Sequence, residues 1–151
     1  VGATQDGAEI SWEPNMVDIE VDQFGDAARA VQSSQKVSLK TKLAEATLEN
    51  LALVWGYPST NVTSGGGNKT MQVGLHGVYP TEHTLSLVGN APNSTATVTK
   101  TRTYTNYRAI SYSSSSHMLK RAENVAFPVD FRILPDPTHT GQEYGTIVDQ
   151  I

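Results

Sequence analysis

The 151-residue chain contains no cysteine, so neither a disulfide framework nor a thiolate metal site can account for its stability or chemistry. It also has no long apolar run. The longest, Leu51–Trp55, is far shorter than the roughly 20 residues that a membrane-spanning helix needs. Val1–Ile10 lacks the basic and apolar regions of a signal peptide. These absences predict a soluble protein without a membrane-spanning segment.

Positive charge is scarce as well. Lys and Arg total 11 against 15 Asp and Glu, which gives a formal net charge of -4. Such a chain has no general attraction for nucleic acids or anionic membranes, because both bind clustered Lys and Arg. Strong helix formers are sparse outside one segment, whereas Ser and Thr are abundant, and this balance favours strands and loops. The length suits a single domain over residues 1–151.

Residue types that carry chemistry are present, but their spacing is not that of known sites. The four histidines are scattered, without the His-Glu-x-x-His spacing of zinc hydrolases, and no Ser lies in a Gly-x-Ser-x-Gly elbow. Gly65–Gly67 is not followed by the Lys and Ser or Thr of a phosphate-binding loop. His139 with Asp136 and Glu143 could make a metal site in principle, but turn residues surround it. We therefore expect no catalytic, cofactor or metal site, and no enzyme.

Two segments alternate strictly between apolar and polar residues, as strands with one buried face do. The first begins at Met16, and its apolar face holds Val17, Ile19 and Val21. Its other face is acidic and consists of Asp18, Glu20 and Asp22. The second covers Val37–Leu43, and its outer face is basic, with Lys36, Lys40 and Lys42. Gln23–Gln35 has no sustained period, and we expect a loop there.

Around Thr47 the hydrophobic period changes from two to about 3.6 residues, which predicts one helix over about 47–55. Thr47 suits the N-cap, and Gly56 is placed to end the helix in a left-handed conformation. Leu48 and Trp55 lie on the apolar stripe, and we expect them to pack the helix onto a sheet.

Further alternation predicts strands at Met71–His76, His83–Val88, Thr97–Tyr112 and Ala126–Leu134. In the last of these, we expect an inward face of Phe127, Val129, Phe131 and Ile133. Three irregular segments complete the chain: an N-terminal arm or hairpin (about 1–12) with an Asp6-Gly7 turn, a flexible loop (about 57–70), and a C-terminal tail (about 136–151). The predicted fold is mainly β, a β-sandwich or barrel with one flanking α-helix, long loops and extended termini.

Oppositely charged strand faces and long loops on a small domain are features that self-assembly uses. A monomeric β domain with ordinary ion pairs between adjacent strands explains the same periodicity equally well.

The order of residues resembles a known family. The runs Gly2–Ala8, Val17–Asp22 and Val37–Leu51, followed by the ending Phe127–Pro137, look like the major tail tube protein of long-tailed, siphovirus-type bacteriophages. The matching order spans most of the chain, and Tyr57–Tyr112 is its least diagnostic part.

The resemblance implies a tail-tube (Hcp-like) β domain, with relatives in contractile tails and type VI secretion. Six copies would form a ring, and stacked rings would form a hollow tube that conducts DNA from capsid to host without sequence-specific binding. The partners would be copies of the chain and other tail proteins, namely the initiator, the terminator and the tape measure. Assembly in the host bacterial cytoplasm would place the subunit in the tail of the virion.

In such a tube, Asp18, Glu20 and Asp22 would line the lumen and repel DNA, or pair with Lys36, Lys40 and Lys42 of a neighbouring subunit. The residues alone leave both roles open. The loop around Gly65, Gly66, Gly67 and Asn68, together with the C-terminal tail, is the candidate for ring stacking.

Two alternatives stay open. The chain could form a tail connector or completion ring, or it could be a β-sandwich module that binds carbohydrate or a host receptor. A binding module would need aromatic residues on one surface, such as Tyr104, Tyr107 and Tyr112. Tyr107 differs from the other two in strand parity, so one continuous strand cannot present all three on one face.

Overall fold

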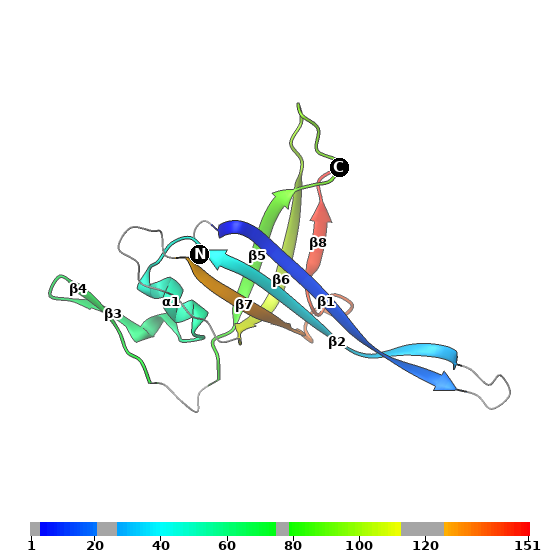
Figure 1. The fold of residues 1–151 in the computed structure, drawn as a ribbon, viewed down its shortest axis with the longest axis horizontal. Helices are drawn as coiled ribbons and strands as arrows, with labels where there is room; N and C mark the ends of the chain where they lie inside the picture. The colour runs from blue at the N-terminus through cyan, green and yellow to red at the C-terminus, as the bar shows by residue number, and fades with distance from the viewer. Residues whose placement is uncertain (1–3, 21–26, 75–78, 113–125) are drawn as a thin grey trace.

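The computed structural model describes residues 4–20, 27–74, 79–112 and 126–151. In these residues the fold is mainly β with one short α-helix, as predicted (Figure 1). The elements, in chain order, are β1 (Thr4–Glu20), β2 (Ala27–Leu43), α1 (Leu48–Val54), the 3-10 turn η1 (Ser59–Asn61), β3 (Val62–Gly65), β4 (Asn68–Met71), β5 (His83–Asn90), β6 (Thr101–Ser111), β7 (Phe127–Leu134) and β8 (Thr146–Asp149).

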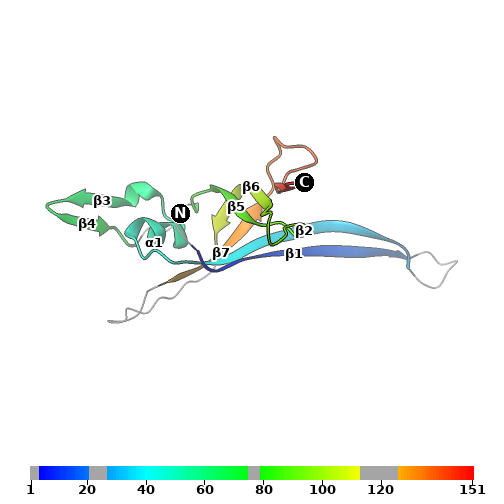
Figure 2. The ribbon, with the colours of Figure 1, turned by 90° about the horizontal axis from the view of Figure 1, so that it is seen from above.

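The main sheet is antiparallel, with strand order β1-β2-β7-β6-β5, and β8 pairs with β6 beside the end of β7. It curls into a half-barrel, which agrees with the predicted sandwich or barrel class. Helix α1 lies against β7 at one end of the sheet, and the β3–β4 hairpin extends beyond the helix (Figures 1 and 2).

The core follows the alternation predicted for the last long strand. Phe127, Val129, Phe131 and Ile133 of β7 are each at most 4% exposed, and they pack with Leu39 and Leu43 of β2 and with Leu53 and Val54 of α1. Fully burying one such side chain contributes about 1.5–3 kcal/mol. The prediction of an inward apolar face over Ala126–Leu134 is therefore confirmed.

Helix α1 lies within the predicted 47–55 and has the predicted ends. The Thr47 hydroxyl accepts a hydrogen bond from the Asn50 amide at 3.2 Å, and Gly56 follows the helix with φ of +70°. The predicted packing of Trp55 is wrong, because this side chain is 36% exposed and the buried residues are Asn50, Ala52, Leu53 and Val54. Trp55 is the C-cap of a seven-residue helix, so the helical period no longer fixes its direction.

The flexible loop predicted over about 57–70 is instead η1 followed by the β3–β4 hairpin. Gly66 and Gly67 have φ of +58° and +81°, the two positive values that a type I′ hairpin turn requires. Each strand has four residues that are mostly exposed, so no hydrophobic period marks them in the sequence. The predicted strand from Met71 onward is also wrong over Gln72–Gly74, because β4 ends at Met71.

Both ends of the first hairpin differ from the predictions. The N-terminal arm belongs to β1 from Thr4 onward, and β2 begins at Ala27, inside the predicted loop. The predicted Asp6-Gly7 turn is a β-bulge, at which the register passes from Gln5 opposite Lys42 to Ala8 opposite Thr41. Bulges and tight turns use the same left-handed backbone conformations, so this dipeptide alone cannot distinguish them.

The C-terminal tail contains a strand. After a turn region over residues 135–145, β8 pairs with β6, with Val148 opposite Thr103 and Ile147 opposite Tyr104. β6 begins at Thr101, four residues later than predicted, because Ser94 and Thr95 hold the preceding residues in a turn through contacts with Lys100 and Val98. The apolar side chains of β8, Ile147 and Val148, are exposed.

Candidate functional site

The outer halves of β1 and β2 form a two-stranded ribbon that projects from the body of the molecule (Figures 1 and 2). β7 pairs only with Val37–Leu43 of β2, so residues 13–20 and 27–36 have no third strand among the described residues. We call these two segments the ribbon. An isolated two-stranded hairpin is at best marginally stable in water, so a ribbon of this kind gains stability from any surface that covers it.

Large apolar side chains are exposed on the ribbon. Val17, Ile19 and Val31 are 50%, 48% and 43% exposed, and Val17 lies directly opposite Val31 on one face. We call these three residues the tip patch. On the opposite face, Trp12 at the base of the ribbon and Met16 are exposed too. The prediction of a half-buried strand is therefore wrong for a single copy, because this part of β1 extends past the core.

The apolar face of β1 changes sides along the strand. Ile10 packs against the core, and Trp12 and Met16 follow on the same face by alternation. Val17 and Ile19 lie on the other face, which carries the polar residues of β1 over the body of the sheet. A contact that covers the tip patch therefore approaches from the side opposite to the core of the chain.

The basic residues of β2 have acidic neighbours within the chain. Lys42 Nζ lies 2.9 Å from Asp6 Oδ2, and Lys36 Nζ lies 3.7 Å from Glu13 Oε2. Lys40 stands in register with Glu9 on one side and with Asp130 on the other. Exposed pairs of this kind contribute little stability, but they neutralise the basic face locally.

The acidic residues of the first strand lie elsewhere. Asp18 stands opposite Ala30 and Glu20 opposite Ala27, near the end of the ribbon, and Asp22 is outside the described residues. In a single copy, Asp18 is therefore out of register with the lysines of β2. Pairing between neighbouring copies stays a prediction.

A second exposed surface lies on the outer side of β5, β6 and β8. Two cross-strand rows form it: Val88, Thr103 and Val148, and beside them Ser86, Thr105 and Thr146. We call these six residues the neutral face, because none of them is charged. Val88 and Val148 are 66% and 60% exposed. The next row, Leu87, Tyr104 and Ile147, points to the opposite side, where Leu87 packs against the core.

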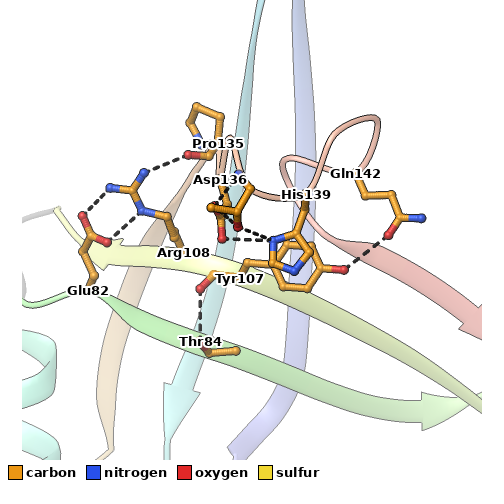
Figure 3. Close-up of polar contacts among 9 residues, drawn as sticks. Glu82, Thr84, Tyr107, Arg108, Pro135, Asp136, His139 and Gln142 are labelled. Atoms are coloured by element: carbon orange, nitrogen blue, oxygen red, sulfur yellow. Dashed lines mark hydrogen bonds and ion pairs between the residues drawn. The ribbon is translucent and has the colours of Figure 1, made fainter.

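Polar contacts hold the turn region of residues 135–145 against β6, and Figure 3 shows them. The His139 ring stacks on Tyr107 with centroids 3.7 Å apart, and His139 Nδ1 lies 3.1 Å from Asp136 Oδ2. Hydrogen bonds from Thr138, and then the one with His139, hold the pKa of Asp136 below its ordinary value. Gln142 accepts a hydrogen bond from the Tyr107 hydroxyl at 3.4 Å. The cluster therefore fastens this turn region to the sheet.

Beside this cluster, Arg108 forms a two-pronged ion pair with Glu82, with distances of 2.8 Å and 2.6 Å, and donates to the Pro135 carbonyl at 3.0 Å. The Arg108 guanidinium holds the pKa of Glu82 below its ordinary value. Glu143 accepts from the Gly141 amide and does not join His139 and Asp136. In the part of the chain that the structure describes, no group of three or more His, Asp or Glu side chains is arranged to hold a metal ion.

The three tyrosines of the binding-module alternative do not share one surface. Tyr104 lies in the row on the core side of β6, whereas Tyr107 lies on the opposite side under His139. Tyr112 follows the end of β6, where its ring centroid is 5.9 Å from Lys36 Nζ. This arrangement lacks the aromatic platform that a carbohydrate or receptor site would use.

No family model matches the chain, and no curated protein matches it significantly. No helix among the described residues is long and apolar enough to cross a membrane. The surfaces described above therefore carry the functional argument.

Proposed function

We propose that the chain is a structural subunit of a bacteriophage tail tube, in which hexameric rings stack into a hollow tube that conducts DNA from capsid to host. The ribbon is the observation that carries this proposal, because it projects from the body and exposes apolar side chains on both faces. The order of residues that resembles siphovirus-type tail tube proteins supplies the specific class of assembly.

Free strand edges support assembly as well. In the described sheet, β1 pairs with β2 alone and β5 pairs with β6 alone, so each has one unpaired edge. β1 has 17 residues, and an edge of that length is a template for pairing with another chain. A sheet that continues from copy to copy around a closed ring removes such edges.

The distribution of charge favours the lumen role for the acidic ribbon residues. The lysines of β2 already have acidic neighbours, whereas Asp18 and Glu20 stand opposite alanines. Acidic side chains on the inner wall would repel the phosphates of passing DNA and keep it from binding. The proposed lining includes Asp22, which lies outside the described residues. Charge reversal at Asp18 and Glu20 that leaves both the tube and DNA delivery normal would refute this role.

The β3–β4 hairpin, which occupies part of the segment predicted as a flexible loop, is our candidate for ring stacking. Its turn, Gly65–Asn68, projects beyond α1, and Lys69 Nζ binds Glu49 Oε1 at 2.5 Å. A hairpin held in this way presents its tip with less loss of conformational entropy than a flexible loop. Shortening the turn should then spare folding and stop tube growth at single rings.

The test is negative-stain electron microscopy of the purified chain over a wide concentration range, with and without the tail initiator of the same phage. Hollow tubes built of sixfold rings are the expected result. Rings that never stack, even with the initiator, would favour a connector or completion ring. Monomers under all conditions would refute a tail tube.

A further inference from the structure

We propose that the tip patch of one copy docks on the neutral face of a second copy. The contact would place Val17, Ile19 and Val31 of the ribbon against the strand rows that hold Val88 and Val148. This inference rests on the proposed function and deepens it, because it names the two surfaces that join neighbouring subunits.

The chemistry of the two surfaces is matched. The tip patch is apolar, Arg29 lies directly opposite Ile19 on the same face, and the next charges on that face are the ion pair of Glu13 with Lys36, nearer the body. The neutral face has two exposed valines, and its other residues are Ser and Thr. A Ser or Thr hydroxyl can be covered by an apolar surface when it forms a hydrogen bond within its own sheet. None of these nine residues is charged, and the exposed Arg29 at the edge of the tip patch can keep its guanidinium in water, so no charge has to be buried unpaired.

The ribbon points away from the body of its own chain (Figures 1 and 2), so its tip patch does not lie on the neutral face of the same copy. The ribbon that occupies the neutral face therefore belongs to a second copy. The tip patch also lies on the face of β1 opposite to the core, as described above. Docking would make the ribbon one side of a sheet-on-sheet contact, which supplies the cover that a two-stranded hairpin lacks. The opposite face of the ribbon, with Asp18, would remain accessible.

The proposed contact favours a ring or a filament over a dimer. The tip patch and the neutral face are different surfaces, so the contact is heterologous, and each copy can give one contact and receive another. Heterologous contacts generate closed rings or open filaments, whereas a contact of a patch with itself stops at a dimer. The proposed contact therefore suits a ring or a tube.

Cysteine cross-linking tests the contact directly, since the natural chain has no cysteine to interfere. Val17→Cys and Val148→Cys replace exposed side chains, so each variant should fold, and Ile19→Cys with Val88→Cys provides a second pair. We expect a chain that carries both cysteines of a pair to form a ladder of covalent multimers on mild oxidation. Each single variant, as matched control, should give less than about a tenth of that cross-linked product.

Electron microscopy of the same samples separates the two proposals. Wild-type tubes without a ladder from either double variant would overturn the docking contact and leave the tail tube standing. Dimers from a single variant in the same yield as the ladder would also overturn it, because that result indicates a patch that contacts itself. A ladder without rings or tubes would support the contact and refute the tail tube.

Acidic substitutions give an independent test. Val17→Asp with Ile19→Asp removes the tip patch, and Val88→Glu with Val148→Glu removes the neutral face. Each double variant should weaken self-association at least about tenfold. An equimolar mixture still contains one intact patch of each kind, so it should form a 1:1 heterodimer in analytical ultracentrifugation that grows no further. Unchanged assembly of either variant would contradict the contact.

Discussion

Replacing Gly145 by alanine should weaken the attachment of β8 to β6 far more than the same change at Gly141. Both glycines lie in the turn region before β8 and have positive φ, +125° and +79°. At Gly141 an added Cβ meets no atom within 4 Å, whereas at Gly145 it would lie 2.0 Å from the Thr105 carbonyl oxygen. The two backbones would have to separate by about 1 Å to restore even a tight contact.

The magnitudes follow from these contacts. A non-glycine residue in the left-handed region costs about 1–2 kcal/mol, which is the loss expected for Gly141→Ala. For Gly145→Ala, the separation would also break the bond from Asn106 Nδ2 to the Tyr144 carbonyl, now 2.9 Å, and strain the bond from the Gln150 amide to the Thr101 carbonyl. With about 0.5–1.5 kcal/mol for each of the two hydrogen bonds added to the backbone strain, the total loss becomes roughly 2–5 kcal/mol.

Urea unfolding followed by far-UV circular dichroism measures the loss, and hydrogen exchange locates it. The amide of Gln150 should exchange much faster in Gly145→Ala than in Gly141→Ala, while the amides of β7 exchange alike in both. Equal losses of unfolding free energy in the two variants would refute the reasoning, because the close approach to Thr105 would then be immaterial.

Three further outcomes are expected. Phe131→Ala should lower the free energy of unfolding by about 3–5 kcal/mol in urea, because it leaves a cavity in the core, and a loss below about 1 kcal/mol would contradict the assigned core. Thr47→Ala should cost about 1 kcal/mol in the same assay through the lost N-cap bond, with Thr47→Ser as the control that keeps it. Asp136, Glu143 and Asp149 all have lowered pKa values in the fold, so their stabilising contacts are complete above pH 4.5 and are lost as the pH falls through the folded values. Limited proteolysis with an acid-active protease should therefore release the C-terminal segment before the core unfolds, and simultaneous loss would argue against it.

The sequence predicted well those elements that the chain buries within itself. β7 alternates under the core, so its inward residues follow directly from its period, and α1 has both its N-cap and its terminating glycine. The β3–β4 hairpin and residues 29–34 of β2 were missed for one reason: these residues are exposed on both faces of their strands, and a period appears only where one face is buried. Such strands are held by hydrogen bonds between backbones, and these bonds place little constraint on the type of residue.

The tip patch is the opposite case, in which the sequence has a period but the single copy leaves the apolar face exposed. Val17 and Ile19 alternate with acidic residues, and this pattern predicted a strand with one covered face. In a single copy no element of the described chain covers that face, and both side chains remain about half exposed. Alternation of apolar and polar residues indicates that one face of a strand is covered, but it does not identify the covering surface. Apolar alternation on a projecting ribbon therefore favours a partner. Because the apolar face of β1 changes sides between Met16 and Val17, the core of the same chain cannot be that partner. A partner would have to approach the ribbon from the opposite side, and the neutral face of a second copy, which we propose as that partner, has the matching chemistry.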